Sequence, residues 1–193
     1  MSVDPVSVAV AFAVALAIIL VLFLAVTAYN GVVALRQRAE KAWANIEVVL
    51  KQRHDQLPNL VNAVRGMMGF EREVLEEVTR QRARWSPDDT PPAQAAASDG
   101  TTTAVRTLLA TVEAYPELTS QGNVLELQAE IERLESMIAD RRELYNDTVY
   151  RYNTTIATLP ALVLAPIFGW RPREFFAATA EDRARPDATL RPG

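Results

Sequence analysis

Residues 5–35 read PVSVAVAFAVALAIILVLFLAVTAYNGVVAL, and this stretch contains no Asp, Glu, Lys, Arg or His. It is almost continuously apolar from Val6 to Ala28. A bilayer core is roughly 30 Å thick, and a helix that rises about 1.5 Å per residue needs around 20 apolar residues to cross it. The stretch therefore predicts a transmembrane helix over residues 6–28, preceded by a short N-terminus of residues 1–5.

Two other interpretations of this stretch fit the sequence less well. A cleaved signal peptide has a basic start and a shorter apolar region, whereas Asp4 is the one charged residue before this stretch. A buried core helix needs a larger soluble part around it, because every side of this segment is apolar. The transmembrane interpretation is the one we adopt.

The charges around the predicted span indicate its orientation. No Lys or Arg precedes the span, whereas Arg36, Arg38 and Lys41 follow it closely. Basic residues that flank a span stay preferentially in the cytoplasm. We therefore expect a single-pass protein of the cell membrane, with its N-terminus outside and its C-terminal domain in the cytoplasm.

The composition limits the remaining possibilities. The chain has 193 residues, and the part after the span is long enough for one domain with a single core. The net charge of −4 is mild and the basic residues are interleaved with acidic ones, so no nucleic-acid partner is expected. Cysteine is absent, which excludes disulfides and thiolate metal sites.

The hydrophobic pattern over residues 29–176 predicts an all-α fold. Apolar residues recur at steps of three and four in one long segment and of three, four and seven in another, which is the pattern of amphipathic helices. The first set is Val32, Leu35, Ala39, Ala42, Ile46 and Val49, and the second is Leu127, Ile131, Leu134, Ile138, Tyr145, Tyr152, Ile156 and Leu159. We predict a transmembrane helix followed by an antiparallel (up-down) four-helix bundle with long helices, at about 29–56, 58–84, 103–115 and 123–158.

Three boundaries of this scheme are hypotheses. Pro58 disfavours helical geometry before it, so we predict a chain reversal there, with a kinked continuous helix as the alternative. Residues 86–103 are predicted to form a loop, although the alanines at 93–97 are compatible with an earlier start of the third helix, which Pro116 would end. The polar residues 177–193 are expected to be disordered.

Several blocks of sequence resemble the LemA family. The first is carried by Tyr29–Arg36, Ala42–Ile46 and Leu50–Val61, and later blocks are Glu113–Leu118, Arg141–Asn153 and Phe168–Phe176. The blocks stand in order over roughly residues 29–176, which makes the resemblance specific. One departure is Asp99–Thr103, which is poorer in helix formers than the family usually has there.

The resemblance implies a membrane anchor with a short external end, a cytoplasmic antiparallel helical bundle and no established biochemical activity. Some relatives are associated with membrane remodelling around magnetosomes, and others are encoded beside a membrane heat-shock peptidase. Together these associations suggest a scaffold or adaptor role.

The polar residues offer few chemical sites. His54 is the single histidine, so a di-iron ligand set cannot be built, and a solvated or capping role in a charged turn is the favoured interpretation. No phosphate-binding glycine loop follows Gly66 or Gly69. We expect no enzyme activity, no catalytic residue, no metal and no cofactor.

Two Tyr-Asn pairs are candidate structural or interaction positions. They are Tyr145-Asn146 and Tyr152-Asn153, and their seven-residue spacing places them on one helix face. Buried tyrosine hydroxyls and amides need partners, and we expect these from Arg53, Asp55 or Asn59 beside Pro58, or from a bound partner.

The apolar tail at 159–176 supports two alternatives. It is too short to span a bilayer and carries a mixture of aromatic and basic residues, so one hypothesis is that it contacts the membrane surface. The residues of that hypothesis are Phe168, Trp170, Arg171, Arg173, Phe175 and Phe176. The alternative is that Leu162, Ile167, Phe168, Phe175 and Phe176 close the end of the bundle.

These observations favour a membrane-anchored helical scaffold or adaptor at the cytoplasmic face. Its expected partners are the lipid bilayer and other membrane proteins or a second copy of the chain. The alternative is a ligand-sensing or binding module, which a large apolar pocket between helices would favour.

Overall fold

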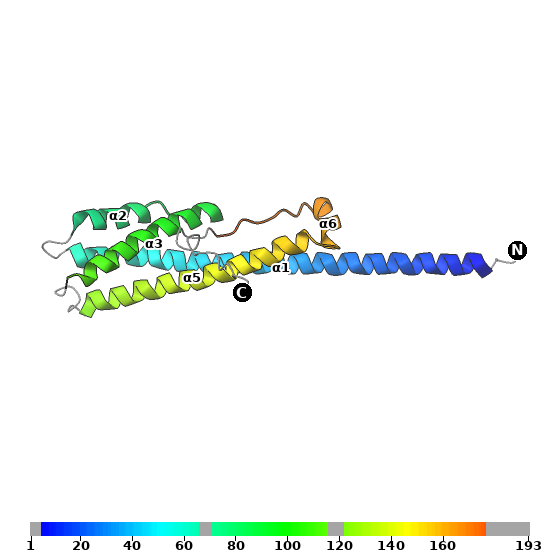
Figure 1. The fold of residues 1–193 in the computed structure, drawn as a ribbon, viewed down its shortest axis with the longest axis horizontal. Helices are drawn as coiled ribbons and strands as arrows, with labels where there is room; N and C mark the ends of the chain where they lie inside the picture. The colour runs from blue at the N-terminus through cyan, green and yellow to red at the C-terminus, as the bar shows by residue number, and fades with distance from the viewer. Residues whose placement is uncertain (1–4, 66–70, 116–121, 177–193) are drawn as a thin grey trace, which may run out of the picture. The chain divides into compact units, whose positions relative to one another are not determined.

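The computed structural model describes residues 5–65, 71–115 and 122–176, which form five helices and no strand (Figure 1). The helices are α1 (Pro5–Arg65), α2 (Arg72–Arg82), α3 (Pro91–Glu113), α5 (Gly122–Ile156) and α6 (Ala161–Phe168). The all-α prediction is confirmed. The chain divides into two compact units: the first unit is residues 1–42 and 147–174, and the second unit is residues 43–146 and 175–193.

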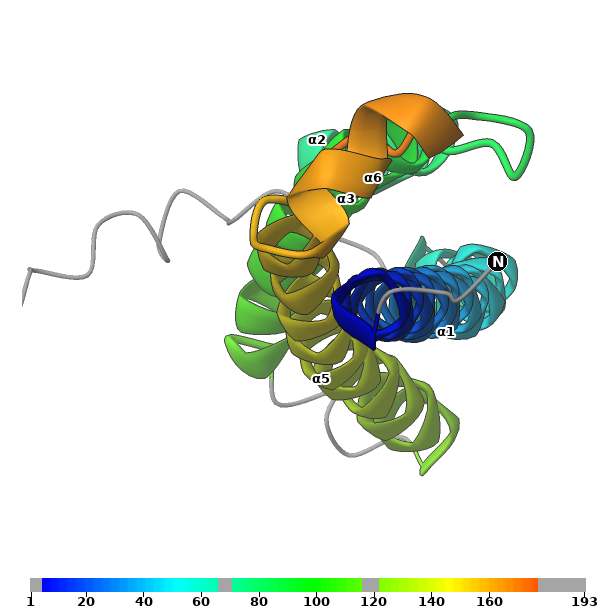
Figure 2. The ribbon, with the colours of Figure 1, turned by 90° about the vertical axis from the view of Figure 1, so that its right-hand side faces the viewer.

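The second unit contains four helices that alternate in direction. Arg82 at the end of α2 contacts His54 of α1, so α2 runs back along α1 after a connection at 66–71. Along α3, Gln94 contacts Glu47 and Thr102 contacts Arg53. Along α5, Glu135 contacts Arg53 and Tyr145 contacts Trp43. These pairings give α3 the direction of α1 and α5 the opposite one, which is the predicted up-down arrangement. Figure 2 shows α5 beside α1 in a view along α1.

The core of the second unit is built from the apolar faces of these helices. The predicted seam residues Ile46, Val49, Ile131, Leu134 and Ile138 are all buried. Burial of one such side chain contributes about 1.5–3 kcal/mol. They are joined by a further set from all four helices: Leu50, Leu57, Leu60, Val61, Val64, Leu75, Val78, Ala104, Val105, Leu108, Val112, Val124 and Tyr145.

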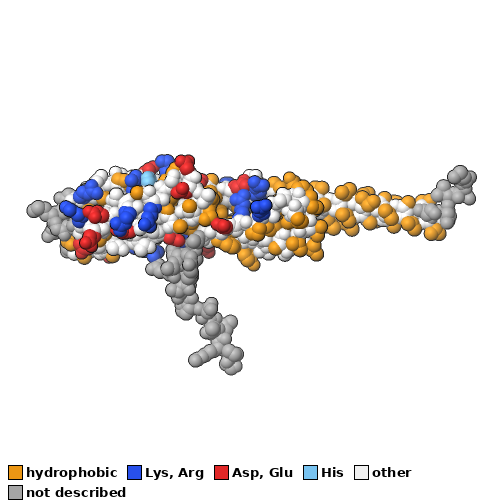
Figure 3. All heavy atoms as spheres, turned by 90° about the horizontal axis from the view of Figure 1, so that it is seen from above, with side chains coloured by type: hydrophobic (Ala, Val, Ile, Leu, Met, Phe, Trp, Pro, Cys, Tyr) orange, Lys and Arg blue, Asp and Glu red, His pale blue; other side chains and the backbone are white. Residues whose placement is uncertain are grey.

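The first unit has a smaller core and a long exposed part. Val32 of α1, Tyr152 and Ile156 of α5 and Ala161 of α6 form one buried cluster, with Leu35 and Trp170 packed against it. The large apolar side chains from Val6 to Val26 are exposed, as the hydrophobic colour over the N-terminal part of α1 shows in Figure 3. Among the described helices, α1 is the one that is long and apolar enough to cross a membrane.

The predicted reversal at Pro58 is wrong, because α1 continues through this proline to Arg65. The continuous alternative is the one found, so residues 58–65 extend α1 rather than open a second helix. A proline lacks the N–H that would bond to the carbonyl four residues earlier, which here belongs to His54. That carbonyl instead accepts a hydrogen bond from Arg82 Nε at 2.8 Å.

The predicted loop at 86–103 is also mostly wrong. The alternative of an early start is correct, because α3 begins at Pro91 with proline in its first turn and includes Asp99–Thr103. The fourth predicted helix, 123–158, matches α5 closely. Residues 1–4, Gly66, Gly69, Pro116 and the tail 177–193 lie outside the described residues, so their predictions stay predictions.

The apolar tail of residues 159–176 forms a short helix and an extended segment. Helix α6 ends at Phe168, and Gly169 after it has a φ of +65°, a left-handed conformation that glycine adopts without strain. The amide of Trp170 then donates to the carbonyl of Ala165 at 2.9 Å. This turn directs the chain from α6 into the extended residues 170–176.

Candidate functional site

Arg53 on α1 is a polar residue of the second unit with partners on two other helices. It occupies a position of the apolar seam between Leu50 and Leu57, and it is only 2% exposed. Its Nη1 donates to Glu135 Oε1 and to Thr102 Oγ1, each at 2.8 Å. Its Nη2 donates to Ser98 Oγ at 2.9 Å. One guanidinium therefore joins α1, α3 and α5.

The acceptors around Arg53 are also bonded to one another. Thr102 Oγ1 donates to the second carboxylate oxygen of Glu135 at 2.7 Å. A buried ion pair is favourable only where its charges are paired and its remaining polar atoms have partners. The arrangement meets that condition, and we infer that its primary role is to fix the alignment of the three helices.

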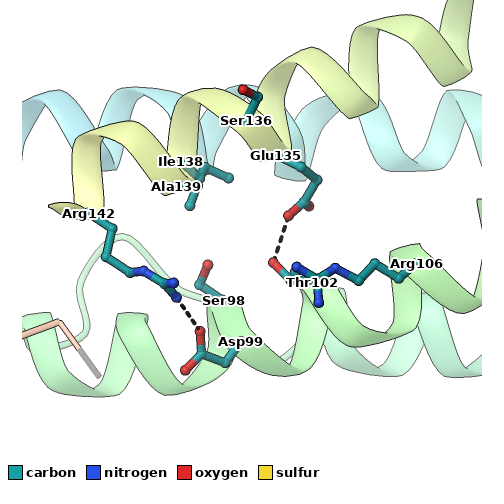
Figure 4. A pocket seen from close by; sticks show the side chains of 9 residues that line it. All are labelled: Ser98, Asp99, Thr102, Arg106, Glu135, Ser136, Ile138, Ala139 and Arg142. Atoms are coloured by element: carbon teal, nitrogen blue, oxygen red, sulfur yellow. Dashed lines mark hydrogen bonds and ion pairs between the residues drawn. The ribbon is translucent and has the colours of Figure 1, made fainter. Parts of the chain in front are cut away.

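A small pocket of about 210 Å³ opens beside this cluster, between α3 and α5 (Figure 4). Its wall includes an ion pair between Arg142 and Asp99, at 3.6 Å, and the hydrogen bond between Thr102 and Glu135. Ligand pockets are typically about 300–1,000 Å³ and mostly apolar. This pocket is smaller than that, and its central groups already bond to each other.

His54 lies beside the polar cluster rather than in a turn. Its ring is 5.0 Å from that of Trp85, and its buried Nδ1 has no hydrogen-bond partner within the described part of the chain. Burial and then the charge of Arg82 lower the pKa of His54. A capping role is wrong, because His54 lies inside α1, where its half-buried imidazole packs against the ring of Trp85 beyond α2.

The other predicted residues around Pro58 make local contacts. Asp55 accepts a hydrogen bond from Lys51 at 3.0 Å, which lowers the pKa of Asp55. Asn59 donates to Gln56 at 3.0 Å, and Pro58 is an internal residue of α1. The expectation that Arg53, Asp55 and Asn59 serve the Tyr-Asn pairs is wrong, because each has different partners.

In the first unit, Asn153 of α5 holds the extended segment after α6. Its Oδ1 accepts from the Arg173 amide at 2.8 Å, and its Nδ2 donates to the Arg173 carbonyl at 2.9 Å. The Arg173 guanidinium pairs with Glu40 at 2.8 Å and lies 5.8 Å from the ring of buried Tyr152. Arg173 is thus held through both its backbone and its side chain.

In the second unit, Asn146 holds Phe176 by the same pattern of bonds. Its Oδ1 accepts from the Phe176 amide at 2.8 Å, and its Nδ2 donates to the Phe176 carbonyl at 3.2 Å. The Phe176 ring is 2% exposed and lies 6.0 Å from Trp43, which in turn packs edge-on against Tyr145. Each Tyr-Asn pair therefore supplies one buried ring and one backbone-binding amide.

The residues of the membrane-contact hypothesis divide into two groups. Phe168 and Trp170 pack with Tyr29, and the side chains of Phe168 and Arg171 are exposed. Phe175 is half exposed. The hypothesis is wrong for Phe176, because that ring is buried in protein, and Arg173 is engaged by Glu40.

Sequence reasoning missed the partners of Arg53 and the extended segment bound by the asparagines. One available signal was the place of Arg53 on a seam that is otherwise apolar, because a charge at such a position needs a buried partner. No comparable signal marked Ser98 and Thr102, which lie in a stretch of small polar residues. The backbone groups of Arg173 and Phe176 carry no side-chain signal at all.

Comparison with known proteins identifies a family. A model of the LemA family matches residues 42–189, which is well over half of the chain. No curated protein matches the chain.

Proposed function

The chain belongs to the LemA family, and on this premise we propose that it is a membrane-anchored helical scaffold or adaptor at the cytoplasmic face of the cell membrane. Its expected partners are the lipid bilayer and either other membrane proteins or a second copy of itself. The proposal assigns no enzyme activity, metal, cofactor or nucleic-acid ligand.

One observation carries the anchoring part of this proposal. The apolar side chains of α1 from Val6 to Val26 are largely exposed, for example Phe12 at 72% and Phe23 at 63%. Residues 6–28 of this helix are about 35 Å long, which exceeds the roughly 30 Å of a bilayer core. A row of exposed large apolar residues of that length is suited to lipid and not to water.

The charges that follow the apolar part support a cytoplasmic bundle. Arg36 and Arg38 are exposed, and Arg36 is paired with Glu40 on the next turn. Acidic residues contribute little to the orientation of a span, so the basic residues favour the cytoplasmic side for this end of the apolar stretch.

Two pockets beside α3 give more support to a scaffold than to a ligand-binding module. The pocket between α3 and α5 is small, and the hydrogen bond between Thr102 and Glu135 in its wall is internal to the protein. A second pocket, between α2 and α3, is about 260 Å³ and includes Gln81, which hydrogen-bonds to Glu77. Neither is the large apolar cavity that would favour ligand sensing.

Anchoring and orientation are tested with single cysteines, because the chain contains none of its own. Ser2→Cys and the exposed Ser136→Cys are each introduced into the full chain in intact cells. An impermeant maleimide is expected to label the first before lysis and the second only after it. Reversed labelling would contradict the orientation, and release of the intact chain from membranes by alkaline carbonate would contradict the anchor.

The scaffold role is tested by cross-linking in native membranes. A photoreactive residue replaces exposed Glu132 on α5, and the matched control places it at Leu16 in the apolar stretch. Recurrent capture of one membrane protein, or of a second copy, from position 132 is expected. Capture of lipid alone at both positions would contradict a scaffold.

A further inference from the structure

Helix α6 has an apolar surface that the described protein leaves uncovered. Its sequence, ALVLAPIF, contains no polar or charged side chain. Its inner face buries Ala161 and Ala165, whereas Val163 is 61% and Ile167 is 71% exposed. Leu162 and Phe168 are about half exposed as well, and Leu159 just before the helix is 74% exposed. Neighbouring exposed apolar residues of this kind mark a binding surface more often than isolated ones do.

The position of this surface is set by contacts within the first unit. The Tyr29 ring lies 4.9 Å from that of Phe168 and 5.9 Å from that of Trp170, and Phe168 stacks on Trp170 at 5.3 Å. Tyr29 directly follows the apolar stretch of residues 6–28. Helix α6 therefore lies beside α1 at the point where the apolar stretch ends (Figure 1).

The depth of this point can be calculated from helix geometry. Val32, which shares a buried cluster with Ala161, lies four residues beyond Ala28, or about 6 Å along the helix. The headgroup region adds about 5–8 Å on each side of the hydrocarbon core. If residues 6–28 fill that core, α6 packs on α1 within the thickness of the headgroup layer.

The side chains around α6 are typical of the headgroup layer. Tyr29 and Trp170 are residues of the kind that concentrate at membrane interfaces, where a ring meets both apolar and polar surroundings. Arg171 follows Trp170 and is exposed, so its charge is available to a lipid phosphate. The segment after α6 is also fixed, because Asn153 and Glu40 hold Arg173.

We propose that α6 is an interfacial helix that inserts Leu162, Val163, Ile167 and Phe168 into the leaflet from which α1 emerges. This inference rests on the proposed membrane anchor. A bilayer is favoured over a protein partner because the exposed surface of α6 adjoins the exposed apolar surface of α1 through Tyr29 and Phe168. The chain would then contact one leaflet through a transmembrane helix and a short surface helix together.

The test measures the depth of three matched positions in the full chain in phospholipid vesicles. A fluorescent probe is attached to Leu16→Cys, Val163→Cys or Val48→Cys, all aliphatic positions that are more than half exposed. The vesicles contain lipids brominated either near the headgroup or near the bilayer centre. Quenching is expected mainly from deep bromines at position 16, mainly from shallow bromines at position 163, and from neither at position 48.

The outcomes separate the inference from the proposed anchor. Deep quenching at position 16 without quenching at position 163 would overturn the interfacial helix and leave the anchor intact. Absence of quenching at position 16 would overturn the anchor itself. Cross-linking of position 163 to protein in place of quenching would show that a protein covers α6, which also overturns the inference.

A second variant tests the same surface without moving the probe. Ile167→Glu places a charge in the exposed face of α6. It is expected to lower the equilibrium constant for insertion of α6 into the leaflet by roughly tenfold. Shallow quenching at position 163 should fall accordingly. Val48→Glu is the control, because it adds the same charge at an exposed site outside α6. Equal quenching in both variants would contradict insertion of α6.

Discussion

The Nε of Arg82 lies 2.8 Å from the carbonyl oxygen of His54 and donates a hydrogen bond to it. In an uninterrupted helix this carbonyl would accept from the N–H of residue 58, but residue 58 is a proline and has no N–H. A side chain of α2 thus replaces the backbone donor that α1 lacks. The contact also joins the end of α2 to the middle of α1.

We predict that the loss of stability caused by Arg82→Met depends on the presence of Pro58. In the natural sequence the substitution should lower the free energy of unfolding by about 1–3 kcal/mol, because a part-buried carbonyl loses its donor. After Pro58→Ala the backbone supplies an N–H, so the same substitution should cost less. Urea unfolding of the four proteins in detergent, followed by circular dichroism, measures the difference.

The matched control for this cycle is Arg80→Met. Arg80 pairs with Glu77 on its own helix and is largely exposed, so its loss should change stability by less than about 0.5 kcal/mol. Equal losses from Arg82→Met with and without Pro58→Ala would show that the hydrogen bond does not compensate for the proline.

The contact between Arg82 and His54 also illustrates which features could be predicted from the sequence and which could not. Apolar spacing correctly placed Ile46, Ile131 and Leu134 in the core, because periodicity is a property of one segment. The continuation of α1 through Pro58 depends on a residue of another helix, so local propensity alone indicated a reversal. Tertiary contact overrode propensity there.

The main prediction placed the start of α3 too late, for a related reason. Asp99–Thr103 has weak helix propensity, yet Thr102 and Ser98 are the residues that contact Arg53. Gly100 is also in this stretch, where a Cβ would lie 2.5 Å from Gln81 Oε1 of α2. Residues that look unfavourable for a helix are thus explained by the neighbours that pack on it, which a single sequence does not reveal.

The pair of Arg53 and Glu135 should be among the most sensitive polar contacts of the bundle. Arg53→Met leaves the Glu135 carboxylate, 17% exposed, without its counter-charge, and removal of one partner from a buried pair costs about 3–5 kcal/mol. The double variant Arg53→Met with Glu135→Leu should recover much of that loss. Chemical unfolding of the single and double variants measures both values.

The control for this prediction is the exposed pair of Arg151 and Asp147. Their side chains are 66% and 50% exposed, so Arg151→Met should cost about 0–1 kcal/mol. A loss from Arg53→Met as small as that of the control would mean that the buried pair does not align the helices.

Asn146 should hold Phe176 through both ends of its side-chain amide. Asn146→Asp keeps an acceptor for the Phe176 amide but places a carboxylate oxygen against the Phe176 carbonyl, where a donor is needed. We expect a loss of about 1–3 kcal/mol and faster hydrogen exchange of the Phe176 amide. Asn59→Asp is the control, since Asn59 bonds only to Gln56 on its own helix among the described residues. Unchanged exchange at Phe176 would contradict this role.

The stability of the second unit should fall as the pH decreases below neutrality, because of His54. Burial lowers the pKa of His54 in the folded protein below its usual 6.5, so the unfolded chain takes up a proton first as the pH falls. Above about pH 7.5 both states are neutral and this contribution is constant. Between the ordinary pKa and the lowered one, each decrease in pH should favour unfolding, and below the lowered pKa stability no longer changes with pH through this group.

His54 is the only histidine, so His54→Gln should make the thermal unfolding midpoint less dependent on pH over pH 5.5–7.5 than it is in the natural chain, measured in detergent. A natural chain whose midpoint is already flat over this range, or rises as the pH falls, would show that the buried imidazole is not held neutral.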